Sequence, residues 1–258
     1  MAKLRASSIG RDLAIAQGYV SGYRSFRKFG INRAVGTTFE EIWSAGGPYN
    51  WLQAASAVRI KAGGASTDDA ASTGALEITV NGLDEDWNEA SETIVTAGAS
   101  ASAPTTTTFI RVYRAYVSQT GTYTGANDGD IDVETTGGTL VARVTEGLGQ
   151  TLMAITSVPA KHTLWLTRFR VIVGDTNKEA SVCIHKRDRA DVVTPPFGVH
   201  RTMATFDRVV SGNSANVVYQ SYSSVPEKSD LWIRANTTSG TASVSAGFDY
   251  ILTRNPPS

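Results

Sequence analysis

Four carboxylates at alternate positions are the residues whose spacing best suits metal chemistry. Asp128, Asp130, Asp132 and Glu134 recur with a period of two, so they share one face of a predicted strand. Clustered carboxylate oxygens suit a hard cation such as Ca²⁺. The run has neither the glycine nor the distal glutamate of an EF-hand loop. A solvated acidic strand edge, which deters the addition of a further strand, is therefore the favoured interpretation.

Cysteine and histidine offer a second, weaker constellation. Cys183 and His185 are two residues apart and share a strand face, while His162 and His200 lie elsewhere in the sequence. Structural zinc requires four ligands, usually in tight pairs, and the chain has no second pair. We therefore expect a buried cysteine, a surface histidine, no bound metal and no cofactor.

The sequence lacks the usual patterns of an enzyme. It contains no Gly-x-Ser-x-Gly elbow and no glycine-rich phosphate loop on a strand–helix unit. A glycosidase needs two carboxylates across a cleft, but the acidic residues at positions 84–92 follow a predicted turn and are expected to solvate it. We predict that the protein is not an enzyme.

Composition indicates a folded, strand-rich protein. The chain has 258 residues, of which 41% are hydrophobic and 19% charged, with 24 glycines and a single cysteine. These values favour a packed core and exclude an internal disulfide framework. With no long apolar stretch and no signal-peptide pattern, we expect a soluble protein made in a cytoplasm, without membrane contact.

The pattern of short alternating segments predicts an all-β fold. About a dozen strands with turn signals every eight to twelve residues are typical of a jelly-roll-type antiparallel β-sandwich, either one large or two consecutive. Asn81-Gly82 is a strong turn signal, and residues 105–117 are expected to form a central strand. The predicted strands cover residues 37–43, 51–60, 75–80, 83–96, 105–117, 131–134, 139–144, 150–155, 162–173, 180–185, 201–209, 216–222, 231–235 and 241–253.

Charge divides the chain into three predicted parts. Residues 1–33 carry a net charge of +6, residues 34–158 carry −10, and residues 159–258 carry +4. We interpret them as a basic aromatic arm, an acidic β-sandwich part and a second β-sandwich part. Chance placement of solvated charges is the alternative explanation.

The arm is the predicted partner-binding segment. Leu13, Ala16, Val20 and Tyr23 fall on one helical face, although Gly18 and Gly22 weaken that helix. Aromatic anchorage and arginine contacts suit docking on a neighbouring subunit or shell. The alternatives are an arm folded back on its own sandwich and, less favoured, stacking on nucleic acid. The predicted contact residues are Tyr19, Tyr23, Arg24, Phe26, Arg27, Lys28 and Phe29.

Five phrases resemble phrases of virion structural proteins of marine tailed phages. They are GLDEDWNEASET at residues 82–93, FIRVYRAY at 109–116, GQTLMAITSVPA at 149–160, PEKSDLWIRA at 226–235 and AGFDYIL at 246–252. The resemblance covers residues 75–252 in patches and implies a non-enzymatic particle component. It does not imply a place within the virion.

Together these features predict a structural protein of a tailed-phage virion, located in the particle. We expect a capsid-decorating or cementing protein that contacts other virion proteins and copies of itself as a homo-oligomer. The alternative is a glycan- or receptor-binding module of a phage tail or spike, in which exposed Tyr49, Trp51 and Trp87 stack on sugar rings.

Overall fold

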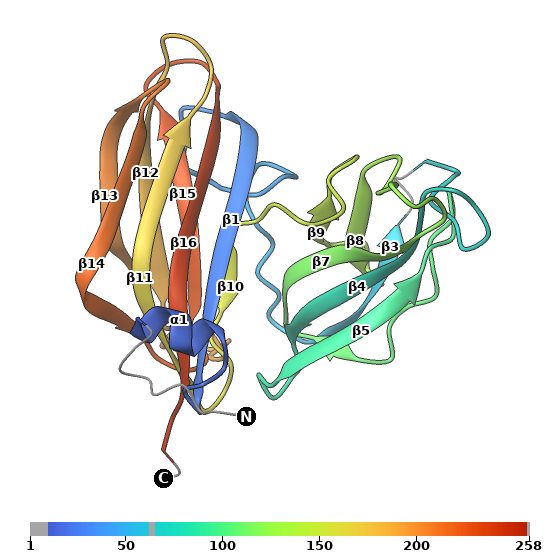
Figure 1. Ribbon diagram of the computed structural model, residues 1–258, viewed down its shortest axis with the longest axis horizontal. Helices are drawn as coiled ribbons and strands as arrows, with labels where there is room; N and C mark the ends of the chain where they lie inside the picture. The colour runs from blue at the N-terminus through green and yellow to red at the C-terminus, as the bar shows by residue number, and fades with distance from the viewer. Residues whose placement is uncertain (1–9, 62–64, 257–258) are drawn as a thin grey trace.

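The chain folds into two β-sandwiches that lie side by side (Figure 1). The structure is a computed structural model that describes residues 10–61 and 65–256. The larger sandwich has facing sheets of order β1–β16–β11–β14 and β10–β15–β12–β13, with β2 beside β15. This order is that of a jelly roll and confirms the predicted fold class. The strands are β1 (Tyr23–Val35), β2 (Glu40–Glu41), β10 (Ile155–Ser157), β11 (His162–Val173), β12 (Glu179–Arg187), β13 (His200–Val210), β14 (Ser214–Val225), β15 (Asp230–Thr237) and β16 (Ala242–Arg254).

The smaller sandwich contains the remaining strands. Its sheets have the orders β6–β3–β8–β9 and β5–β4–β7, and all the strand pairs in them are antiparallel. The strands are β3 (Ser56–Lys61), β4 (Ala75–Leu83), β5 (Glu89–Val95), β6 (Thr108–Phe109), β7 (Arg111–Thr120), β8 (Ile131–Thr135) and β9 (Leu140–Val144). The sequence left open whether one or two sandwiches are present, and the structure has two.

The smaller sandwich is an insertion in the larger one. It lies in the sequence between β2 and β10, two short strands that occupy the same position beside β15. Both β2 and β10 pair with β15, where they follow each other along the same edge. The N–H of Ile42 donates to the carbonyl of Ile233 (2.9 Å), and the N–H of Ala154 donates to the carbonyl of Ile42 (2.8 Å). The chain therefore leaves the jelly roll and returns to it at adjacent points.

This insertion corrects the predicted division at residues 33/34 and 158/159. Both ends of the chain build the larger sandwich, and the first predicted boundary lies inside β1. β1 pairs with β16 and forms an edge of the first sheet, so the segment from Tyr23 onward is not an arm that leaves its own body. Residues 1–9 of the predicted arm lie outside the described residues. Charge asymmetry misled the prediction because opposite charges attract within a chain as well as between chains.

The predicted helical face of the arm is also wrong. α1 covers only Arg11–Ala16, and it buries Ala14 and Ile15 while Leu13 is exposed. Gly18 and Gly22 adopt positive φ angles of 75° and 79°, which residues with a side chain rarely take. These glycines separate the helix from β1.

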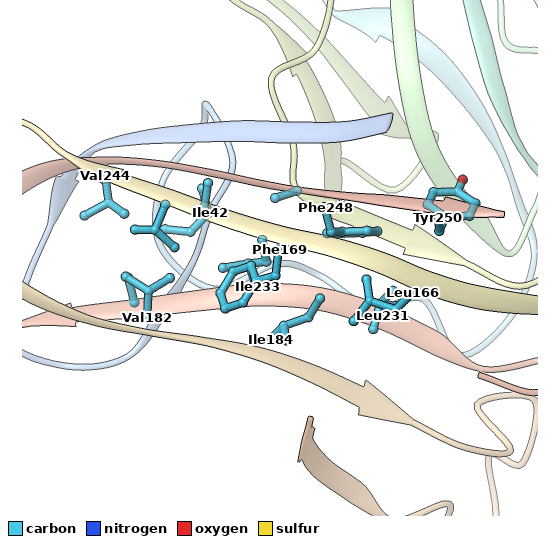
Figure 2. Packing of buried hydrophobic residues seen from close by; sticks show 14 of the residues in the cluster. Ile42, Leu166, Phe169, Val182, Ile184, Leu231, Ile233, Val244, Phe248 and Tyr250 are labelled. Carbon is cyan, nitrogen blue, oxygen red and sulfur yellow. The ribbon is translucent and has the colours of Figure 1, made fainter. Parts of the chain in front are cut away.

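The main core lies between the two sheets of the larger sandwich (Figure 2). Phe169 and Phe248 project from the first sheet and meet Ile184 and Ile233 from the second, and all four are fully buried. Burying each such side chain contributes about 1.5–3 kcal/mol, so this layer supplies much of the stability of the jelly roll.

A bulge in β11 changes which residues face this core. The pairing shifts between Leu166 and Arg168 on both sides of the strand, which reverses the alternation beyond this point. Leu166 and Phe169 are therefore both buried, while Ile172 is 54% exposed. A strict period of two would place Ile172 on the same face as Leu166, and the sequence pattern alone cannot register the extra residue that moves it.

Two local predictions in the smaller sandwich are also corrected. Asn81 and Gly82 do not form a turn, because β4 continues through both and the chain turns after Leu83. A side chain at position 82 would collide with the carbonyl of Arg111, so this glycine permits close strand pairing. β4 is the central strand of its sheet and β7 lies at the edge, contrary to the expectation for residues 105–117.

Gly30 sets the distance between β1 and the insertion point. A Cβ at this position would collide with the backbone of Ile42 and Ala154, neither of which can move independently. We expect Gly30→Ala to destabilise the protein by about 1–3 kcal/mol, as overpacking does. Gly36→Ala, where the nearest atom belongs to the side chain of Glu40, is the matched control. Equal melting temperatures for the two variants would contradict this role of Gly30.

Candidate functional site

A buried carboxylate joins the two sandwiches. Asp230 is fully buried and accepts hydrogen bonds from Nε of Arg111 (2.9 Å), Nη2 of Arg187 (2.7 Å) and Oγ of Ser157 (2.6 Å). Arg111 belongs to β7 of the smaller sandwich, and it also donates to the backbone carbonyls of two residues on its own side. Removing one partner from such a desolvated, hydrogen-bonded pair leaves an uncompensated charge. We call this cluster and the aromatic rings around it the seam.

Aromatic rings enclose the seam. The guanidinium carbon of Arg111 lies 5.4 Å from the ring centroid of Trp51 and 4.9 Å from that of Trp87. The ring of Trp51 also contacts Trp232 of the larger sandwich, with centroids 5.2 Å apart. Tyr49 and Trp87 are buried and Trp51 is half-buried, so these residues are not the exposed sugar-stacking aromatics that the sequence suggested. Their rings pack against an arginine that local sequence does not bring near them.

Two of the predicted arm residues contact the smaller sandwich. Nη2 of Arg24 donates to a carboxylate oxygen of Glu89 (2.7 Å), and the amine of Lys28 donates to the carbonyl of Tyr113. The attraction between the basic N-terminal segment and the acidic segment is thus satisfied here within one molecule.

The other predicted contact residues are spread over different surroundings. Phe26 stacks on Tyr250 with ring centroids 5.3 Å apart, and Arg27 pairs with Asp249. Tyr19 and Phe29 are exposed, and Tyr23 is half-buried at the start of β1. The structure does not gather the seven residues into one surface.

The position of Lys28 predicts a pH dependence of stability. Burial, with repulsion from Arg114, lowers the pKa of Lys28 to about 7 from its ordinary value near 10.5. Between these values the unfolded chain binds a proton that the folded chain lacks, so stability rises with pH from about 7 toward the ordinary pKa of lysine. We expect Lys28→Met to flatten this rise in urea unfolding, whereas the exposed Lys61→Met retains it. A wild-type free energy of unfolding that is constant or falls over this interval would contradict the assignment.

The acidic run of β8 is not a free strand edge. β8 lies between β3 and β9, and its carboxylates are neutralised by arginines of those neighbours. Asp132 accepts from Arg143 (2.6 Å), and Glu134 accepts from Arg59 (2.6 Å). The predicted solvated edge is therefore corrected to a row of cross-strand ion pairs. In residues 10–61 and 65–256, no group of three or more His, Cys, Asp or Glu could hold a metal ion.

Sequence reasoning missed the role of Asp68. Its buried carboxylate accepts hydrogen bonds from the backbone N–H groups of Ala75 (2.8 Å), Asp128 (2.9 Å) and Gly129 (3.0 Å). It thereby fixes the loop before β4 to the loop before β8. Its place in a Ser/Thr/Gly-rich stretch concealed this contact, which joins segments distant in the sequence.

His185 and His200, which are separated in the sequence, meet at the edge of the seam. Nε2 of His200 lies 2.8 Å from Nδ1 of His185, and both rings contact Trp232. Burial, followed by the proximity of His200 and Arg234, lowers the pKa of His185 to about 4. His185 is buried rather than at the surface, while Cys183 is buried as predicted. The pair remains neutral near pH 7 and serves as packing for the tryptophan.

Comparison with known proteins gives a weak structural likeness. No protein-family model and no curated protein matches the sequence. The structure of the Gx strain of infectious bursal disease virus matches with 10% sequence identity and a TM-score of 0.29, and the match covers 92% of this chain and 73% of the other. The structure of the Gt strain matches with 9% identity and a TM-score of 0.27, and the match covers 90% of this chain and 71% of the other. The VP2 subviral particle of the same virus also matches, with 9% identity and a TM-score of 0.28, over 96% of this chain and 78% of the other. TM-scores this low do not establish what the chain does. No helix among the described residues has the length and apolar character needed to span a membrane.

Proposed function

We propose that the chain is a non-enzymatic structural component of a tailed-phage virion, a capsid-decorating or cementing protein that binds neighbouring subunits and copies of itself. In this role the two sandwiches act as one two-lobed body. The alternative role, a glycan- or receptor-binding module of a tail or spike, has lost its original support because Tyr49 and Trp87 are buried in the seam.

One observation carries this proposal: four of the five phage-like phrases each contribute a residue to the seam. Trp87 lies in the phrase at 82–93, Arg111 in that at 109–116, Ser157 in that at 149–160 and Asp230 in that at 226–235. Four of the five phrases therefore contribute to the junction that holds the two lobes together. A shared junction of this kind supports a shared two-lobed architecture, and it supports the particle role through the proteins that it resembles.

A loop beside the seam offers a contact surface for a neighbouring subunit. Between β12 and β13, Val193, Phe197 and Val199 are 47%, 59% and 55% exposed. Gly198 fixes the path of this loop, since a Cβ there would collide with the carbonyl of Asp188. Exposed apolar side chains that cluster on one ordered loop are typical of protein–protein contacts.

Quantitative mass spectrometry of purified particles tests the proposal. We expect the chain in intact, gradient-purified virions of the phage that encodes it, in copies comparable to a capsid lattice. Recovery of the chain only from the lysate, outside particles, would refute the virion role. A handful of copies per particle would contradict the decorating role and would favour the alternative, a glycan- or receptor-binding module of a tail or spike.

A further inference from the structure

We propose that the outer face of the first sheet of the larger sandwich binds an acidic sugar in a hollow to which all four strands contribute. This inference goes beyond the proposed structural role and does not depend on it. The hollow has a volume of about 580 Å³, which lies within the range of small-ligand pockets. Its lining residues come from β1, β16, β11 and β14, together with Ile15 of α1.

An irregularity in strand pairing creates this hollow. In the pairing of β14 with β11, Val218 lies opposite Arg168 and Ser223 lies opposite Leu166. Residues 219–222 of β14 therefore have no partner on β11. Thr167 is the bulged residue of β11 at the same level, and its hydroxyl donates to the carbonyl of residue 249 (2.9 Å). The sheet therefore opens at this point, while α1 covers the neighbouring part of β1 (Figure 1).

The floor of the hollow carries an excess of positive charge. Asp249 is shared by three arginines, with distances of 3.2 Å to Nε of Arg27, 2.8 Å to Nη2 of Arg170 and 3.9 Å to Nε of Arg168. One carboxylate cannot neutralise three guanidinium groups. The side chains of Arg27 and Arg168 are 60% and 41% exposed, so their remaining N–H groups are available to a carboxylate or sulfate group.

The walls of the hollow suit a sugar ring rather than a bare ion. Tyr222 is exposed at the rim and offers its aromatic ring to the hollow. Gln220 supplies an amide suited to hydroxyl groups. The ring of Tyr222 suits the apolar face of such a sugar, the amide of Gln220 suits its hydroxyl groups, and the cationic floor suits its acid group.

Calorimetric titration of the full chain tests this site with defined probes. The probes are a galacturonic-acid trisaccharide, a sulfated galactose trisaccharide, a neutral galactose trisaccharide and a short oligothymidylate. We expect saturable binding of a carboxylated or sulfated trisaccharide, with weak or no binding of the neutral one. The first two probes distinguish the two sources of negative charge.

Variants locate the binding in the hollow. Arg168→Gln is expected to weaken acidic-sugar binding by about tenfold or more, the usual effect of losing one charged hydrogen bond. Tyr222→Ala is the second variant, and Arg33→Gln, an exposed arginine at the other end of β1, is the matched control. Because Tyr222 and Arg33 are exposed and Arg168 is half-buried, we expect melting temperatures close to that of the wild type.

Four results would overturn the inference. They are no binding of either acidic trisaccharide, wild-type affinity in Arg168→Gln, an equal loss in Arg33→Gln, or tighter binding of oligothymidylate than of any sugar. The third would indicate attraction by overall charge, and the fourth a nucleic-acid site. None of these results bears on whether the chain is found in virions.

Discussion

A chain that begins at Gly36 is expected not to form the larger sandwich. This truncation removes β1, which pairs with β16 at eleven positions. Each lost backbone hydrogen bond costs about 0.5–1.5 kcal/mol, and together they approach the whole net stability of about 5–15 kcal/mol of a typical domain. The truncation also exposes Phe248 and Tyr250 on the newly created edge of the sheet.

The matched control for this truncation is a chain that begins at Tyr23. It keeps β1 and loses α1, so the burial of Ile15, worth about 1.5–3 kcal/mol, is the main loss. Circular dichroism and size-exclusion chromatography should show a folded protein with a lower melting temperature. If a chain that begins at Gly36 still melts like the full chain, β1 is not needed for the larger sandwich, and the N-terminal segment is a detachable arm.

Arg111→Ala is expected to be the most damaging single substitution at the seam. It leaves the carboxylate of Asp230 buried with less compensation, and breaking a buried ion pair in this way costs about 3–5 kcal/mol. Urea unfolding should show the loss, with the two sandwiches now unfolding in separate steps.

The control for the seam is Arg208→Ala, which removes an arginine from an exposed pair. Nη2 of Arg208 lies 2.9 Å from the carboxylate of Glu179, and its side chain is 68% exposed. Pairs of this kind contribute about 0–1 kcal/mol. If Arg111→Ala costs no more than this control, the seam does not join the lobes as described.

Strands with regular alternation could be predicted from the sequence. Residues 162–173 were predicted as one strand, and β11 has the same bounds, because alternation and flanking turns are local properties. The bulge within this strand could not be predicted. It is recorded only in the pairing of Leu166 and Arg168 with neighbouring strands, and it determines that Ile172 faces outward.

The insertion and the seam required information that local pattern does not contain. β2 and β10 are short, and each gains its place only by pairing with β15, which lies far along the chain. The partners Arg111 and Asp230 are separated by more than a hundred positions in the sequence, and nothing in their flanking residues couples them. The sequence did indicate that 109–116 and 226–235 matter, through the resemblance to phage proteins, although it did not indicate that they meet.

A reconstruction of the intact particle directly tests the proposal that this chain is a structural component of a tailed-phage virion. We expect two-lobed density that fits both sandwiches, repeated over the capsid surface, with the loop of Phe197 against a neighbouring subunit. A well-resolved capsid and tail in which no density accommodates the two sandwiches would contradict it.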